Sequence, residues 1–152
     1  MDRKLEISYQ HFDSPAAMSA DDMSLVMAAR QAAHRAFAIY SHFSVGAAVR
    51  LASGAVVSGA NVESEVFPAG ICAERNVLFG VATSHPTDPV VALAVVSIST
   101  PRECFPCGLC RQTMVDVERR QQSDVRVIMA GEREATVVAS ARELLPFTFE
   151  LS

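Results

Sequence analysis

The sequence predicts an α/β fold of three layers, α/β/α, with a mixed β-sheet in the middle. Two observations lead to this prediction. A hairpin pattern early in the chain is followed by helix, strand, helix and strand patterns, an order typical of helices packed on a mixed sheet. In addition, the run from Val90 to Ser99 is almost entirely β-branched residues and Ala, which suits a strand buried on both faces.

In the first half of the chain, local signals indicate one helix and one hairpin. Ser19 is followed three residues later by Asp22, as in a capping box, and apolar residues then recur at helical spacing. Further on, Ser53-Gly54 is a turn signal between two short apolar segments. The predicted elements are a helix over residues 23–40 and a hairpin with strands over 43–51 and 55–62.

In the second half, helix and strand patterns alternate. Apolar residues follow helical spacing after Cys72 until the pattern ends near Gly80, and two prolines bracket the loop before the buried strand. A short helical segment near the end of the chain is stopped by Pro146. The predicted elements are a helix over 72–81, strands over 90–99 and 125–130, a helix over 108–120 and a short helix over 140–145.

Length and charge limit the kinds of protein this can be. The 152 residues fit a single domain, 1–152, in which the N-terminal segment 1–18 is poorly defined. The net charge is −4, from 13 basic and 17 acidic residues without any block of Lys or Arg, so we expect no binding to a nucleic acid polymer. No apolar run suits a signal peptide or a bilayer span. We therefore expect a cytoplasmic protein without a membrane partner, in which thiols stay reduced.

Three cysteines and a glutamate form the most informative pattern. Cys72-Ala73-Glu74-Arg75 is followed further along the chain by Pro106-Cys107-Gly108-Leu109-Cys110-Arg111. Reduced cysteines in such a pattern are better explained as metal ligands or catalytic groups than as disulfides. Three thiolates around Zn²⁺ leave one tetrahedral position open, as catalytic zinc sites do. A carboxylate two residues from a ligand can then exchange protons with a water molecule at that position.

Helix geometry restricts how these residues can meet. The two cysteines of the second motif are three residues apart at the start of a predicted helix, where one cation can bind both sulfurs and the helix N-terminus favours thiolates. Cys72 and Glu74 can converge only if their helix begins near Cys72, because residues two apart face different ways on a regular helix. Three thiolates exceed the charge of Zn²⁺ by one unit. We expect Arg75 and Arg111 to offset that excess from behind the ligands.

The cysteines are also compatible with roles other than a catalytic zinc site. A single C-x-x-C pair is typical of redox motifs and of structural zinc half-sites as well. Cys104 forms a second, overlapping C-x-x-C with Cys107, and a fourth thiolate would close the site and make the chain a non-enzymatic zinc-stabilised module. Because Cys104 lies in a proline-flanked loop rather than in a zinc ribbon with two separate C-x-x-C pairs, we expect it to be a buried or loop thiol.

Four motifs occur in order along most of the chain from about residue 23 onward. They are Tyr40-Ser41-His42-Phe43-Ser44-Val45-Gly46-Ala47-Ala48, Gly59-Ala60-Asn61-Val62-Glu63, Gly70-Ile71-Cys72-Ala73-Glu74-Arg75 and Pro106-Cys107-Gly108-Leu109-Cys110-Arg111-Gln112. Together they resemble the cytidine deaminase family in its short, homotetrameric, three-cysteine form, and they fit the zinc deaminase signature with Cys in place of His. The resemblance implies a zinc cofactor, a nucleoside substrate, a homotetramer, and deamination of cytidine or 2′-deoxycytidine to uridine or 2′-deoxyuridine plus ammonia.

The resemblance also implies a role for individual residues. Glu74 would move protons between the water and the pyrimidine ring, with zinc held by Cys72, Cys107 and Cys110. Asn61 and Glu63 would bind the ribose, and their spacing at the end of a predicted strand lets both side chains face the same side. Phe43 would pack against the pyrimidine, and Ala73 would also contact the nucleoside. Phe67 and Phe149 would complete the pocket of a neighbouring subunit.

One stretch departs from the family pattern. After Asn61-Val62-Glu63 the family usually has a polar residue, small residues and then an aromatic, whereas this chain has Ser64-Glu65-Val66-Phe67. Glu65 thus places a second carboxylate where a small residue lines the base pocket. It can turn outward, or it can select a modified cytosine nucleoside or an antibiotic of the blasticidin type, so both substrate classes stay open.

Overall fold

The structure is a computed structural model that describes residues 1–151. Its strands are β1 (Gln10–Phe12), β2 (Val45–Leu51), β3 (Val56–Ala60), β4 (Val90–Ser97), β5 (Arg126–Ala130) and β6 (Ala135–Val138), and its α-helices are α1 (Ala20–Ala33), α2 (Ala73–Ser84) and α3 (Gly108–Gln121). The strands form one sheet in the order β1-β6-β5-β4-β2-β3. β4 and β5 are parallel and the other neighbours are antiparallel, so the sheet is mixed.

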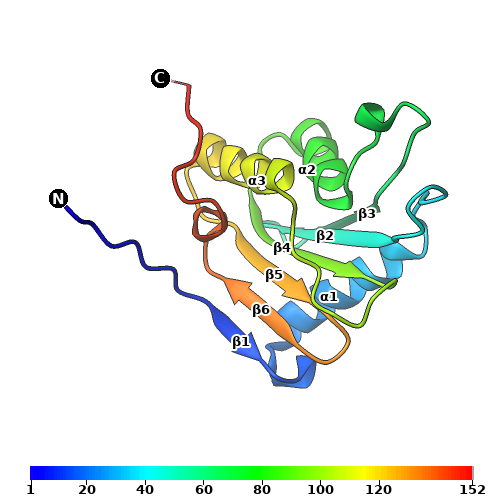
Figure 1. Cartoon of the computed structure of the whole chain (residues 1–152), viewed down its shortest axis with the longest axis horizontal. Coiled ribbons are helices and arrows are strands. Elements are labelled where there is room, and N and C mark those ends of the chain that lie inside the picture. The colour runs from blue at the N-terminus through cyan, green and yellow to red at the C-terminus, as the bar shows by residue number, and fades with distance from the viewer. Residues whose placement is uncertain (152) are drawn as a thin grey trace.

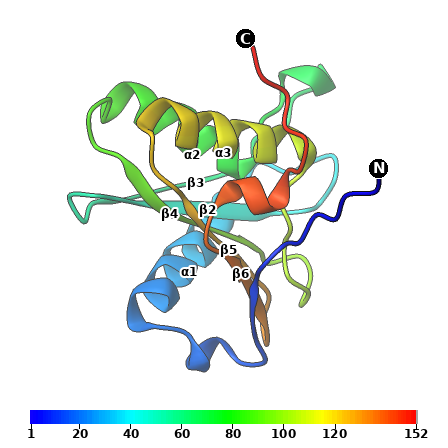
Figure 2. The ribbon, with the colours of Figure 1, turned by 90° about the vertical axis from the view of Figure 1, so that its left-hand side faces the viewer.

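Helices cover both faces of this sheet. α1 packs on one face, and α2 and α3 lie side by side on the other (Figure 1, Figure 2). Each face has its own apolar cluster, one around Leu25 and Ile128 and the other around Leu93 and Met114. β4 contributes to both clusters, which explains its continuous apolar sequence. The predicted three-layer α/β/α fold is confirmed.

The first helix differs from its prediction at its C-terminal end. α1 begins after the N-cap Ser19, whose hydroxyl accepts a hydrogen bond from Asp22 N at 3.1 Å, but it ends at Ala33 rather than at Tyr40. Beyond it, the backbone of Phe37 pairs with Asn61 and Glu63: Phe37 N donates to Asn61 O at 3.0 Å and Glu63 N donates to Phe37 O at 2.8 Å. These contacts with a distant segment replace helical hydrogen bonds, so residues 34–44 form a loop over the end of the hairpin.

Two strands and two short turns are absent from the sequence prediction. β1 and β6 contain three and four residues, too few for a clear alternating pattern, and β1 lies within the segment 1–18 that lacked any predicted element. The short helix expected over residues 140–145 is a 3-10 turn, Ala141–Leu144, and similar turns form at Pro15–Ala17 and Phe67–Ala69. None of the described helices is long and apolar enough to cross a bilayer.

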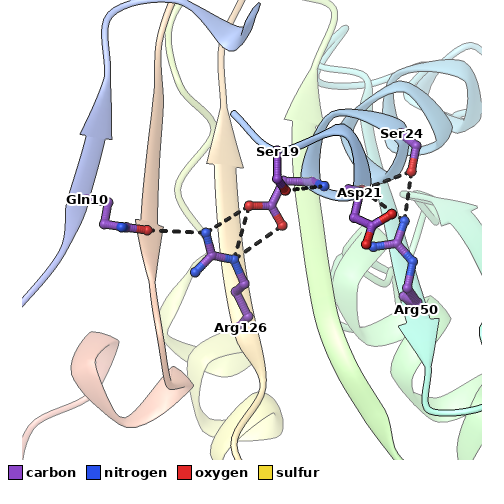
Figure 3. A network of polar contacts seen from close by, with 7 residues as sticks. Gln10, Ser19, Asp21, Ser24, Arg50 and Arg126 are labelled. Atoms are coloured by element: carbon purple, nitrogen blue, oxygen red, sulfur yellow. Dashed lines mark hydrogen bonds and ion pairs between the residues drawn. The ribbon is translucent and has the colours of Figure 1, made fainter. Parts of the chain in front are cut away.

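An ion-pair network attaches the N-terminal strand to the body of the molecule (Figure 3). Arg126 on β5 donates to both carboxylate oxygens of Asp22 on α1, at 2.8 to 3.2 Å, and its Nη2 also donates to Gln10 Oε1 at 3.2 Å. Nearby, Arg50 Nη2 donates to Ser24 Oγ at 2.8 Å. Asp22 is buried, so its charge requires this partner.

A buried carboxylate on α3 holds two further segments in place. Glu118 is 1% exposed and accepts hydrogen bonds from Val125 N at 2.8 Å, Ala141 N at 2.7 Å and Ser140 Oγ at 3.0 Å. Glu118 therefore holds the residue before β5 and the last 3-10 turn against the C-terminal half of α3. The N-terminal end of the same helix carries two of the cysteines.

Candidate active site

The three cysteines of the sequence motifs meet at the N-termini of two helices. Cys72 is the N-cap of α2 and Cys107 is the N-cap of α3, both with extended backbone angles, and Cys110 lies in the first turn of α3. The predicted helix start near Cys72 is thus confirmed. The Sγ atoms of Cys72 and Cys107 are 3.8 Å apart, and those of Cys107 and Cys110 are 3.5 Å apart. Among the described residues these three form the one cluster of potential ligands, with all ligand atoms within 4.8 Å of one another.

This sulfur cluster fits a zinc ion. Zn–S bonds of about 2.3 Å in tetrahedral geometry place neighbouring sulfurs about 3.8 Å apart, close to the separations found here. The positive ends of two helix dipoles point at the same place and favour thiolates. The chemistry and spacing of the donor set therefore match a three-thiolate zinc site.

The sulfurs share protons unequally. Hydrogen bonds, first from Cys110 and then from Arg75 and Cys107, lower the pKa of the Cys72 thiol to about 5, against the opposing effect of burial. The pKa of Cys110 is raised, because the same contact favours its protonated form and because it is buried. Arg75 Nη2 donates to Cys72 Sγ at 3.8 Å. Burial lowers the pKa of Arg75, but contacts with Cys72 and Cys110 outweigh burial, so that the pKa is raised. Arg75 thus stands where an excess thiolate charge requires a cation.

Arg111 supports the site through the backbone. Its Nε donates to Pro106 O at 2.8 Å and its Nη1 donates to Leu144 O at 3.0 Å. It therefore fixes the residue that precedes Cys107, whereas the sequence motif predicts that it contributes charge at the sulfurs.

Glu74 is buried directly beside the cluster. It lies in the first turn of α2 and is only 4% exposed. Burial is the largest cause that raises the pKa of Glu74 to about 7, and the negative charge of Cys72 adds to it. A carboxyl group with a pKa near neutrality can both accept and donate a proton at physiological pH.

A cavity of about 530 Å³ opens next to Cys72 and Arg75. Tyr40 and Phe67 form part of its wall, with their rings edge to face at a centroid distance of 5.8 Å. The remaining lining residues are Ser41, Asn61, Val62, Glu63, Ser64, Gly70 and Ile71. A ligand in this cavity is therefore adjacent to the sulfur cluster.

Comparison with known proteins identifies the family. Residues 19–124 match the model of the cytidine and deoxycytidylate deaminase zinc-binding region. The chain belongs to this family. It is 38% identical over 129 residues to a cytidine deaminase of Halalkalibacterium halodurans, which covers 85% of this chain and 94% of the relative. It is also 33% identical over 129 residues to a cytidine deaminase of Sporosarcina psychrophila, covering 85% and 91%.

Solved structures of cytidine deaminases share the fold. The structure from Burkholderia pseudomallei superposes with a TM-score of 0.75 at 36% identity, covering 87% of this chain and all of the other. The structure from Mycobacterium tuberculosis gives a TM-score of 0.70 at 32% identity, covering 88% and 100%. As a member of this zinc-binding family with a matching sulfur cluster, the chain has a zinc cofactor.

Two of the residues expected at the ribose also hold the protein together. Asn61 Oδ1 accepts a hydrogen bond from Val45 N at 2.8 Å, and its Nδ2 donates to Phe43 O at 2.9 Å. Glu63 Oε1 accepts from Tyr40 N at 3.0 Å and from Ser41 N at 3.1 Å, and hydrogen bonds with Ser41 are the largest cause that lowers the pKa of Glu63. Each side chain keeps part of its hydrogen-bonding capacity for a ligand.

Four residues that the family resemblance implies at the nucleoside lie outside the cavity lining. Ala73 is fully buried, and Glu65 is exposed and does not line the cavity wall. Phe43 is exposed and lies on the same loop as Tyr40, which does line the cavity. The Phe149 carbonyl accepts a hydrogen bond from Gln112 Nε2 at 3.3 Å, on the outer face of α3.

Cys104 lies outside the site, whereas three residues without a predicted role belong to the cavity wall. Cys104 is not part of the sulfur cluster; it packs against the apolar core, and burial raises its pKa to about 12. Tyr40, Ser41 and Ser64 line the cavity, although no role is predicted for them from the sequence. Their positions inside or next to the motifs are the signal that could have found them.

Proposed function

We propose that this chain is a zinc-dependent hydrolase that converts cytidine and 2′-deoxycytidine to uridine and 2′-deoxyuridine with release of ammonia. The observation that carries the proposal is the position of Glu74, buried at the start of α2 and interacting with Cys110 and Cys72 of the sulfur cluster. The family and the names of its curated relatives support the same reaction.

The proposed division of labour places proton transfer on Glu74. Cys72, Cys107 and Cys110 hold zinc, which supplies the Lewis acidity that activates a water molecule near neutral pH. Glu74 accepts a proton from the attacking water and delivers it to ring N3. It then takes the remaining proton from the new hydroxyl group at C4 and passes it to the amine, so that the C4–N bond breaks, the C4 carbonyl forms and ammonia leaves. Burial raises the pKa of Glu74 while a bound cation lowers it, and these opposing effects suit a group that both accepts and donates a proton. Its burial also excludes bulk water from the proton transfer.

The cavity residues orient the nucleoside. Glu63 and Asn61 face the cavity and offer their unused acceptors and donor to the sugar hydroxyls. The family resemblance alone assigns Phe43 to the pyrimidine, since Phe43 does not line the cavity of this subunit. The exposed position of Glu65, outside the cavity lining, supports the unmodified nucleoside over a modified cytosine or a blasticidin-type antibiotic.

The proposal extends to assembly and location. Phe67 lines the cavity yet is 74% exposed, and such an aromatic wall suits burial against another subunit. We place the protein in a homotetramer in which Phe67 and Phe149 border a neighbouring site. A cytoplasmic location keeps the zinc-binding thiols reduced.

A direct assay tests the reaction. The purified chain is incubated with cytidine, 2′-deoxycytidine and a panel of modified cytosine nucleosides, and loss of the cytosine absorbance is followed while zinc is measured on the same sample. We expect about one zinc per subunit and the fastest turnover with the two unmodified nucleosides. Replacing Cys107 with Ala should remove zinc and activity together. A zinc-loaded protein that deaminates none of the panel would contradict the proposal and favour the structural zinc module.

A further inference from the structure

Residues 40–44, the last part of the loop between α1 and β2, reach the candidate site from outside the zinc motifs. Its first two residues, Tyr40 and Ser41, line the cavity, and it carries Phe43. At His42 the backbone has φ 56°, a left-handed conformation that is uncommon for a residue other than glycine. Such a conformation persists only where surrounding contacts impose it.

Hydrogen bonds to nearly all backbone groups of residues 40–45 impose this loop conformation. Every backbone N–H from Tyr40 to Val45 has an acceptor: Glu63 Oε1 for the first two, then Ala38 O, Ser41 Oγ, Ser99 Oγ and Asn61 Oδ1 in order. The carbonyl groups of residues 42, 43 and 44 also have donors, from Ser99, Asn61 and Ser97 respectively. The loop is thus fixed before any ligand binds.

Two serines at the end of β4 provide one side of this clamp. Ser99 Oγ accepts from Ser44 N at 2.8 Å and donates to His42 O at 3.3 Å, so a single hydroxyl bridges the two sides of Phe43 and holds the carbonyl group of the left-handed residue. Ser97 Oγ donates to Ser44 O at 2.9 Å and accepts from Ser99 N at 3.1 Å. Ser97 is 1% exposed, one of few buried polar residues, and these contacts satisfy its hydroxyl.

The placement of the two serines connects the loop to the metal centre. They lie at the end of β4, and the chain continues from them through residues 100–106 to the ligand Cys107. The segment that carries a zinc ligand therefore also holds the loop that borders the nucleoside. Asn61 and Glu63, on the opposite side of the loop, complete the clamp.

We infer that Ser97 and Ser99 are positioning residues of the deaminase, which hold the 40–44 loop in the conformation that receives the nucleoside. The inference rests on the proposed function for its kinetic consequence. Neither hydroxyl reaches the reacting atoms. Their loss should weaken the binding of substrate and transition state equally, which raises KM and leaves kcat unchanged.

Three substitutions and a matched control test the inference. Ser97→Ala and Ser99→Ala each remove one of the two hydroxyl groups, whereas Ser99→Thr retains a hydroxyl group at position 99. Ser24→Ala is the control, because its hydroxyl also makes two hydrogen bonds, with Arg50 and Asp21, but on α1, away from the cavity. For each alanine variant of the clamp, we expect KM for cytidine to rise about threefold to tenfold, with kcat within about twofold of wild type. Ser99→Thr should restore KM, and Ser24→Ala should leave it unchanged.

Amide hydrogen exchange on residues 40–45 separates this inference from the proposed function. Removing either hydroxyl should speed exchange of these amides by about tenfold, whatever the substrate is, while the Ser24→Ala variant retains wild-type protection there. A wild-type protein without cytidine activity would refute the proposed function and leave this exchange test intact. Unchanged protection in both alanine variants, an unchanged KM in an active enzyme, or a Ser99→Thr variant as impaired as Ser99→Ala would each overturn the positioning role.

Discussion

Gly46 on β2 is the position where one added methyl group should do most damage to the fold. A Cβ atom there would lie 1.9 Å from Ala29 O and 2.5 Å from Ala33 N, both backbone atoms of α1. Neither atom can rotate away as a side chain would. To reach ordinary contact, α1 must retreat from the sheet by about 1.5 Å.

This retreat determines the magnitude of the effect. α1 buries Leu25, Val26 and Ala29 against the sheet, so moving it opens space along the whole contact. Overpacking of a well-packed core typically costs about 1–3 kcal/mol, and more where the obstacle is rigid. We therefore expect Gly46→Ala to lower the free energy of unfolding by about 3 kcal/mol or more, which for a chain of this length lowers Tm by about 6–12 °C.

Thermal unfolding at fixed protein and zinc concentrations measures this change, and Gly80→Ala is its matched control. Gly80 lies within α2, and nothing stands within 4 Å of its added Cβ. The same substitution there should stabilise the protein by about 0.5–1 kcal/mol, because Ala has the higher helix propensity. If Gly46→Ala melts within about 2 °C of wild type, the close packing of α1 on β2 described above is wrong.

Three further predictions concern the supports of the site. Glu118→Ala should lower the free energy of unfolding by about 2–5 kcal/mol in chemical denaturation, because it leaves two buried backbone N–H groups without an acceptor; a loss under 1 kcal/mol would contradict the contacts of Glu118. Arg111→Met should weaken zinc binding about 10- to 100-fold, measured by competition with a chelator. An unchanged zinc affinity would show that the hydrogen bond from Arg111 to Pro106 O does not help to position Cys107. In zinc-free protein, the rate of Cys72 alkylation should increase as the pH is raised through about 5, because loss of the proton at that pKa creates the reactive thiolate. Cys104, whose pKa is raised to about 12, should stay unreactive at pH 8. Equal reactivity of Cys72 and Cys104 at pH 7 would contradict these assignments.

The parts of the structure that follow from local chemistry were predictable from the sequence. Ser19 precedes a helix at the expected place because N-cap preferences act over a few residues. The helix start at Cys72 was predictable from the spacing of Cys72 and Glu74, which can converge only where a helix begins. The spacing of Cys107 and Cys110 likewise determines how their sulfurs meet. The continuous apolar run of β4 was recognisable because both of its faces are covered.

Features that depend on distant contacts were not predictable. α1 ends early because Phe37 pairs with residues 61 and 63, and β1 and β6 exist only as partners in the sheet. The contacts of Ser99 with His42 and Ser44 join residues more than fifty positions apart. A single sequence carries no local signal for such pairs, and the same holds for the second role of Asn61 as a loop anchor.

Kinetics of Glu74→Gln, with zinc measured on the same sample, test the central claim most directly. The amide preserves the shape of the side chain but cannot accept a proton from water. We predict an unchanged zinc content, an unchanged melting profile within a few degrees, and a fall in kcat for cytidine of about 10²- to 10⁴-fold. Near-normal turnover by a zinc-loaded Glu74→Gln enzyme would contradict the assignment of proton transfer to this residue.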